Sequence, residues 1–341
     1  MRLQSNVACF FLALCFCTIV HGDQTTVWEE FQSNFLTQDG RVIDYYNNQC
    51  SHSEGQGYGM LLATMHSDKK VFDAIWQWTK ENIGVRGDSL FAWKWGERMK
   101  GKWGVMDYNN ATDGDVLIAY ALLKADELWP GNNYKDEGLL IIESVRKNLI
   151  IERNGQKFLL PGYYGFIREN GFIVNPSYIV FPAYREFAKA DDKHFWQQVY
   201  RDSLDLVTKS CFGSLQLPAD WIIVRKADTA IFSEKKPYFG YEAIRTFLYL
   251  SWEEDAQLPD GLERMLYMYK KLDYIPLWVD LISDGISLES APAGFYAVFA
   301  RAAEKLGKKN ISKKLFQEAR ERLGNNKKDY YSYCLYLLSE S

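Results

Sequence analysis

The chain has 341 residues, with 40 Lys and Arg against 44 Asp and Glu, so its formal net charge is −4 at pH 7. A mildly acidic chain of this kind lacks the basic surface that nucleic-acid binding needs, and it does not suggest a polyanionic substrate.

The first 22 residues have the organisation of a secretory signal peptide. Arg2 supplies the positive charge, and the apolar run from Val7 to Val20 is short for a bilayer span. Val20-His-Gly22 places a small residue at a candidate cleavage point. An uncleaved membrane anchor is the alternative. We expect an exported protein, periplasmic or secreted, whose mature chain of 23–341 has no stable membrane insertion.

Cysteine usage predicts a fold that is held by its core rather than by disulfides. Cys50, Cys211 and Cys334 follow the predicted leader and are far apart in sequence. An odd number argues against a disulfide framework, although one bridge among the three stays open. A chain of this length is ample for a large hydrophobic core.

Helical periodicity recurs through the whole mature chain, without a linker or a low-complexity segment. The expected helices cover about 26–37, 56–66, 70–82, 114–129, 136–150, 179–189, 194–208, 241–252, 259–271, 291–306, 311–323 and 330–339. Strand patterns are few, at 158–160, 172–174 and 221–224. A single domain of about twelve helices suits an α/α toroid, but helix counting alone leaves other all-α arrangements open.

The stretch from Asn110 to Trp129 combines an acidic start with a helical sequence. Thr112 and Asp115 have the spacing of a capping box, with Asp in place of the usual Glu or Gln. Asp113 and Asp115 would then lie where a helix N-terminus favours negative charge. Taken by itself, the stretch indicates a helix start. We expect a structural role for Asp115, bonded to that start.

Several motifs together resemble glycoside hydrolase family 8. Ala111-Thr-Asp-Gly-Asp115, followed by Ile118-Ala-Tyr-Ala-Leu-Leu123 and Trp129, resembles the signature segment of that family. Four further segments agree in order and spacing, namely Ser53-Glu-Gly-Gln-Gly-Tyr-Gly-Met60, Asn175-Pro-Ser-Tyr178, Asp220-Trp221 and Tyr241-Glu-Ala-Ile-Arg245. The chain most resembles the endoglucanases that accompany bacterial cellulose synthesis. The resemblance implies an all-α (α/α)6 barrel with short strands in its loops.

The resemblance also implies catalytic residues. The general acid of the family corresponds to Glu54, which lies among three glycines that let the backbone turn sharply or approach a neighbour closely. From the local sequence alone, Glu54 could instead cap a helix beginning near Gln56. Asp113 matches the residue that lies beneath the sugar at the cleavage point and helps to hold its ring distorted.

The position of the general base departs from the family pattern, because Glu242 replaces the usual Asp. Glu keeps the charge but moves the carboxylate about one methylene further. An inverting glycosidase leaves roughly 6.5–9.5 Å between its two carboxyl groups, and a misplacement of ~1 Å can cost about 100-fold in rate. Glu242 is therefore the predicted base, with Asp220, Asp228 and Asp284 as alternatives.

Aromatic residues make up 16% of the chain and are suited both to a core and to stacking on sugars. Trp93 and Trp95 would share one side of an extended segment, where a place in the core is the alternative; Trp103 is a further candidate. Arg245, one helical turn past Glu242, can hydrogen-bond to it. The predicted substrate-binding residues are Trp93, Trp95, Tyr178, Trp221, Tyr241 and Arg245.

The remaining chemistry is expected to need no cofactor and no metal ion. His52, His66 and His194 lack a metal-ligand spacing, although His52 is near enough to Glu54 in sequence to tune it. We expect a monomeric, inverting endo-β-1,4-glucanase that acts on cellulose-like chains. A cellulose synthesis and export complex is the candidate protein partner. The alternatives are a non-catalytic glycan-binding protein of an export system, and the same hydrolysis on xylan, chitosan or mixed-linkage glucan.

Overall fold

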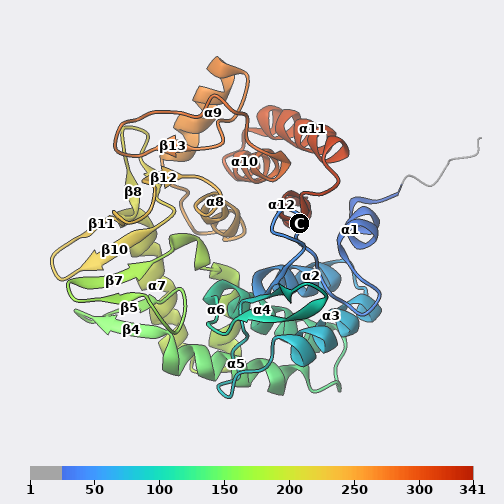
Figure 1. The fold of residues 1–341 in the computed structure, drawn as a ribbon. Coiled ribbons are helices and arrows are strands. Elements are labelled where there is room, and N and C mark those ends of the chain that lie inside the picture. The colour runs from blue at the N-terminus through green and yellow to red at the C-terminus, as the bar shows by residue number, and fades with distance from the viewer. Residues whose placement is uncertain (1–24, 341) are drawn as a thin grey trace, which may run out of the picture.

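The computed structural model describes residues 25–340, whose helices form two concentric layers (Figure 1). The predicted leader at 1–22 lies outside the described residues. The inner layer consists of α2 (Ser53–Met65), α4 (Thr112–Leu128), α6 (Phe181–Ala190), α8 (Ile244–Ser251), α10 (Ala293–Lys305) and α12 (Tyr330–Glu340). The outer layer consists of α1 (Val27–Phe35), α3 (Lys69–Asn82), α5 (Tyr134–Asn148), α7 (Lys193–Lys209), α9 (Gly261–Leu272) and α11 (Lys309–Asn325).

Contacts between helices close the inner layer into a ring. Each inner helix contacts the next one along the chain, and α12 returns to contact α2. Each outer helix covers an inner neighbour, as α3 covers α2 and α5 covers α4. The described residues therefore form the expected (α/α)6 barrel.

The burial of each layer follows from its sequence. All eight residues of α8 are buried, five of them apolar or aromatic, while Arg245, Thr246 and Ser251 are buried polar residues. In α11 the buried residues are Ser312, Leu315, Ala319 and Leu323, spaced three or four apart on one face. Alternation of such helices along the chain produces the two layers.

Each predicted helix has an observed counterpart, with shifted ends. The helix expected at 56–66 begins at Ser53, so the glycines that follow Glu54 are helical and make no sharp turn. The other predicted role of these glycines, a close approach of the backbone to a neighbour, is confirmed at Gly57. A Cβ there would lie 2.7 Å from the Cβ of Leu117 in α4.

A second glycine makes the crossing of α2 and α4 tighter still. A Cβ on Gly114 would lie 2.3 Å from Ser53 Oγ and 2.7 Å from the backbone nitrogen of Glu54. Real Cβ atoms do not approach so closely, because interiors are already packed at high density. Glycine at this position therefore lets the first turns of the two helices meet, which brings Glu54 beside Asp113.

Short strands occupy the loops, and more of them are present than the sequence predicts. The expected β7 (Gly171–Val174) and β10 (Ile222–Arg225) lie in a sheet of order β11-β10-β7-β6, with β11 (Thr229–Ile231) and β6 (Ile167–Arg168). The strand expected at 158–160 corresponds to β5 (Gln156–Leu159), which pairs with β4 (Ile150–Arg153). The remaining pairs are β8 (Cys211–Phe212) with β9 (Leu217–Pro218), and β12 (Tyr238–Phe239) with β13 (Val279–Asp280).

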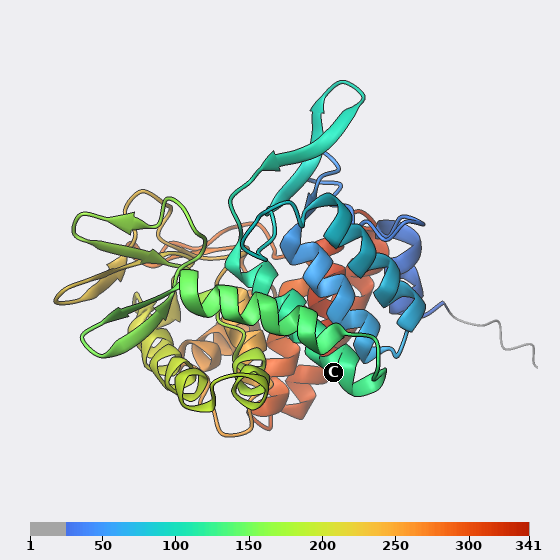
Figure 2. The same cartoon turned by 90° about the horizontal axis from the view of Figure 1, so that it is seen from below.

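The longest of the strand pairs that the sequence did not predict is a hairpin. It consists of β2 (Lys94–Met99) and β3 (Lys102–Asp107) and projects from the barrel (Figure 2). Its residues are largely exposed, among them the large apolar side chains of Met99, Trp103 and Met106, and Gly101 makes the turn with a φ of 74°. At its base β2 pairs with β1 (Ser51–His52), which leads directly into α2.

Two further expectations concern membranes and thiols. Among residues 25–340, no helix combines the length and hydrophobicity of a membrane span. Cys50, Cys211 and Cys334 are free thiols, so the described part of the chain forms none of the disulfides that the sequence left open.

Candidate active site

A cavity of about 690 Å³ lies where the inner helices begin. Its wall includes Glu54, Asp113 and Tyr330, from the first turns of α2, α4 and α12. Glu242 and Pro292 line it just before α8 and α10. Aligned peptide dipoles make helix N-termini favourable for negative charge, so this end of the barrel suits carboxylates.

The guanidinium of Arg245 joins the three predicted carboxylates. Its Nη1 donates to Glu54 and, at 2.9 Å, to Oδ2 of Asp113, while its Nη2 donates to Glu242. Arg245 is only 1% exposed, and hydrogen bonds between ionised groups are the strong ones. One buried cation thus gathers Glu54, Asp113 and Glu242 around a single point.

The Asn175-Pro-Ser-Tyr178 segment supports this arrangement from the opposite side. Ser177 Oγ accepts a hydrogen bond from Nη2 of Arg245 at 2.9 Å, and Asn175 Nδ2 donates to Oε2 of Glu242 at 3.1 Å. The ring centroid of Tyr178 lies 5.4 Å from the Arg245 guanidinium carbon. The sequence predicts Arg245 as a substrate contact. Arg245 lines the cavity, and both of its terminal nitrogens have protein partners, so it also positions the acids.

Asp113 and Glu54 are neighbouring acids that accept from the same nitrogen, Nη1 of Arg245. Asp113 is 1% exposed. Burial, followed by the negative charge of Glu54, raises the pKa of Asp113 well above its usual range, while Arg245 acts in the opposite direction. Two carboxyl groups in contact are costly to ionise together. Asp113 therefore retains its proton to higher pH than an exposed aspartate does.

Among the candidate bases, Glu242 faces the cavity and Asp220 stands behind it. Oδ1 of Asp220 accepts hydrogen bonds from the backbone nitrogens of Gly240 (3.0 Å) and Ala243 (2.8 Å). It thereby fixes the turn that carries Glu242. Burial raises the pKa of Asp220 to about 7, but Asp220 does not line the cavity.

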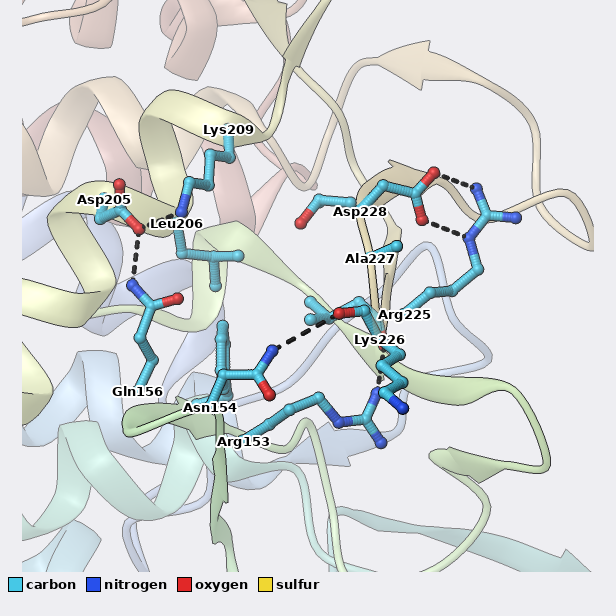
Figure 3. A pocket seen from close by; sticks show the side chains of 13 residues that line it. Arg153, Asn154, Gln156, Asp205, Leu206, Lys209, Arg225, Lys226, Ala227 and Asp228 are labelled. Carbon is cyan, nitrogen blue, oxygen red and sulfur yellow. Dashed lines mark hydrogen bonds and ion pairs between the residues drawn. The ribbon is translucent and has the colours of Figure 1, made fainter.

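The other two alternatives lie elsewhere. Figure 3 shows a separate cavity of about 320 Å³ in which Asp228 pairs with Arg225 at 2.8 and 3.0 Å. Its walls come from β4, β5, α7, β10 and β11. Oδ1 of Asp284 accepts from the backbone nitrogen of Ser214 at 2.9 Å. Neither acid lines the cavity that contains Glu54.

The predicted aromatic residues divide into two groups. Trp93, Tyr178 and Tyr241 line the cavity, and Tyr241 is 52% exposed. Trp95 packs instead against Trp78 and Trp103, with Arg41 over both Trp95 and Trp103. Trp221 lies behind Tyr178, with its ring 6.0 Å away. Trp95 and Trp221 are thus outside the cavity lining.

The predicted capping box at the start of α4 is wrong. Ala111 is the N-cap residue, and Thr112 Oγ1 donates to the carbonyl of Leu160 at 2.7 Å. Asp115 accepts from the backbone nitrogen of Phe91 at 2.9 Å and from Asn110 Nδ2 at 2.7 Å. Its role is structural, as expected, but it holds the neighbouring loop rather than the start of its own helix.

Sequence reasoning missed one whole side of the cavity. This side comes from the loop after α1 and from the start of α12. Its residues are Asp44, Tyr46, Asn47, Asn326, Asp329, Tyr330 and Tyr331. They fall in none of the matched motifs, and only the closure of the ring between α12 and α2 brings them to the cavity. The adjacent tyrosines at 330 and 331 are the single sequence feature that could have indicated this side of the cavity.

Comparisons with known proteins point to one enzyme family. The family model described as "Glycosyl hydrolases family 8" matches residues 4–341. A "Probable endoglucanase" of Novacetimonas hansenii is 36% identical over 276 residues, which cover 80% of each chain. An "Endoglucanase" of Cellulomonas uda is 34% identical over 276 residues, covering 80% of this chain and 76% of the relative. The solved structure of the endo-beta-1,4-glucanase CMCax from Acetobacter xylinum has a TM-score of 0.81 at 33% identity, covering 92% of this chain and 95% of that one.

Proposed function

The chain belongs to glycoside hydrolase family 8, and from this premise we propose that it is an inverting endo-β-1,4-glucanase acting on cellulose-like chains. The observation that carries the proposal is the gathering of Glu54, Asp113 and Glu242 on Arg245 in one open cavity. A protein that only binds glycans has no need for three converging acids. The relatives named as endoglucanases support the substrate class.

In the proposed reaction Glu54 is the general acid. It protonates the glycosidic oxygen as the bond to the anomeric carbon breaks, which is the usual task of the first carboxyl group in an inverting enzyme. Its neighbour Asp113, whose pKa is raised by burial, lies beneath the sugar at the cleavage point. Arg245 donates to both carboxyl groups and holds them in place.

Glu242 is the proposed general base. It accepts a proton from the water that attacks the opposite face of the sugar, so that the configuration at the anomeric carbon inverts. Asn175 and Arg245 hold its Oε2, which leaves its other oxygen for the water. Trp93 and Tyr241 line the cavity, where their rings can contact sugars. Export through the leader at 1–22, to the periplasm or the medium, completes the proposal.

The test is a panel of polysaccharides with the anomeric form of the products resolved. Carboxymethylcellulose and swollen cellulose are compared with mixed-linkage β-glucan, xylan and chitosan. We expect viscosity of the soluble glucan to fall faster than reducing ends appear, and we expect NMR spectra of early products to show the α-anomer first. An initial β-anomer would contradict inversion. Binding without cleavage of any polymer would favour the glycan-binding alternative.

A further inference from the structure

A cysteine, a histidine and an aspartate meet in the wall of the cavity, beside the proposed acid. Each of Asp44, Cys50 and His52 offers a ligand atom within 4.8 Å of the other two. Cys50 Sγ is 3.1 Å from His52 Nε2, and Asp44 Oδ2 is 3.9 Å from the other ring nitrogen of His52, Nδ1, so an ion would use only one of these two nitrogens. None of the three has a part in the proposed hydrolysis.

Local backbone structure explains why these three side chains converge. A β-bridge pairs Asp44 with Cys50 across a tight loop in which Asn48 and Gln49 have positive φ values of 53° and 55°. His52 follows Cys50 by two residues in an extended segment, so both side chains point to the same face. The loop therefore presents a thiol, an imidazole and a carboxylate together.

We propose that Asp44, Cys50 and His52 form a binding site for a thiolate-preferring divalent cation of the Zn²⁺ class. Sulfur, imidazole nitrogen and carboxylate oxygen are the ligands that Zn²⁺ takes in proteins, with bonds of about 2.0–2.3 Å. Tetrahedral ligands at such distances lie roughly 3.5 Å apart. With one ligand atom from each residue, the three atoms lie within 4.8 Å of one another, so a closure of about 1 Å completes the site. Binding replaces the S–H bond of Cys50 by a sulfur–metal bond, and the proton leaves to solvent.

The surroundings of the three ligands are suited to an ion entering from the cavity. Asp44 and His52 line the cavity, while Cys50 is buried behind them at 1% exposure. Oδ1 of Asp44 is held by the backbone nitrogens of Tyr46 (3.0 Å) and Asn47 (3.2 Å), which leaves Oδ2 directed toward the imidazole. Three protein ligands leave the fourth tetrahedral position open toward the cavity.

Occupation of this site would interfere with glucan binding. His52 lies two residues before Glu54, and its ring is stacked on Trp93 at 5.8 Å between centroids. An ion held there places a divalent charge beside the acid and draws the imidazole away from the tryptophan. We therefore expect Zn²⁺ to inhibit hydrolysis. Metal binding is measured directly, so the test of the site does not depend on the proposed hydrolytic activity.

The positive charge of Lys94 gives a second way to test the same site. Lys94 Nζ lies 3.3 Å from Asn47 Oδ1, and its charge acts on both Cys50 and His52. Like charges repel more strongly in a partly desolvated site than in water. Lys94→Gln should therefore tighten metal binding several-fold, although it removes none of the ligands.

The experiment uses the full chain after treatment with a chelator. Zn²⁺ is titrated by calorimetry, and Co²⁺ serves as a spectroscopic probe whose near-ultraviolet charge-transfer band reports a thiolate ligand. Cys50→Ser and Asp44→Asn remove ligands. Cys211→Ser is the matched control, since Cys211 is a half-buried thiol in β8 that belongs to no such cluster.

We expect the wild type and Cys211→Ser to bind a single Zn²⁺ with equal affinity and to show the Co²⁺ band. Cys50→Ser should lose the band and bind at least about 100-fold more weakly, and Zn²⁺ should no longer inhibit it, since even changes behind a ligand cost 10–100-fold. Absence of the band from the wild type, or equal Zn²⁺ affinity in Cys50→Ser, would overturn the proposal and leave only a hydrogen-bonded network. Should Cys50→Ser fail to fold, the Co²⁺ band of the wild type and the Zn²⁺ affinity of Asp44→Asn still test the proposal.

Discussion

The substitution Glu242→Asp tests whether the site has adapted to the longer acid. Oε2 of Glu242 lies 3.1 Å from Asn175 Nδ2 and accepts from Arg245 Nη2. Loss of a methylene withdraws the carboxylate by about 1.5 Å, the length of a carbon–carbon bond. The contact with Asn175 then exceeds the range of a hydrogen bond. The shorter acid keeps its charge but loses its position.

The expected magnitude follows from that displacement. A catalytic group misplaced by ~1 Å costs about 100-fold, which corresponds to roughly 2.7 kcal/mol in the activation free energy. Since Trp93 and Tyr241 are untouched, the loss should appear in kcat with little change in KM. Initial rates on a soluble β-glucan, measured by release of reducing ends, give both constants.

Glu263→Asp on α9 is the matched control, because Glu263 is an exposed acid that pairs with Lys308 far from the cavity. We expect it to retain the wild-type rate and melting temperature. A kcat of Glu242→Asp equal to or above that of the wild type would refute the reasoning. An inactive wild type that gains activity with Glu242→Asp would favour the glycan-binding alternative.

Three other predictions concern the acid, the helix crossing and the buried aspartate. Glu54→Gln should lower glucan hydrolysis by about 100-fold or more without changing the melting temperature; near-normal rates would mean that another group is the acid. Gly114→Ala should lower the free energy of unfolding in urea by about 1–3 kcal/mol, because its Cβ would meet Ser53; unchanged stability would show that the helices can separate freely. Burial raises the pKa of Asp220 from 3.8 to about 7, so the folded chain keeps a proton that the unfolded chain loses, and this contribution to stability declines as pH rises from about 4 to 7. Asp220→Asn should remove that decline, worth up to about 4 kcal/mol, and should retain turnover if Glu242 is the base; an unchanged pH slope of unfolding would contradict the shift.

The sequence by itself determined the helices and the family. Apolar residues at helical spacing indicate a helix from the local sequence alone, so α8 and α11 can be predicted without tertiary information. Motifs such as those around Glu54 and Asp113 are local too, which explains why their order was sufficient for the family and for the (α/α)6 barrel. Helix ends were less accurate, since the start of α2 at Ser53 depends on its crossing with α4.

Only the tertiary structure decided which residues share the cavity. Arg245 contacts Glu54 and Asp113, which are 191 and 132 positions away in the sequence. A local sequence pattern cannot predict contacts between residues so far apart in the chain. Asp44 and Tyr330 reach the cavity because α12 closes the ring against α2. Trp95 and Trp221 carry the same chemistry as Trp93 but face neighbouring rings, since packing rather than residue type directs a side chain. The pattern of a sequence fixes which side chains are available, and long-range packing fixes which of them meet.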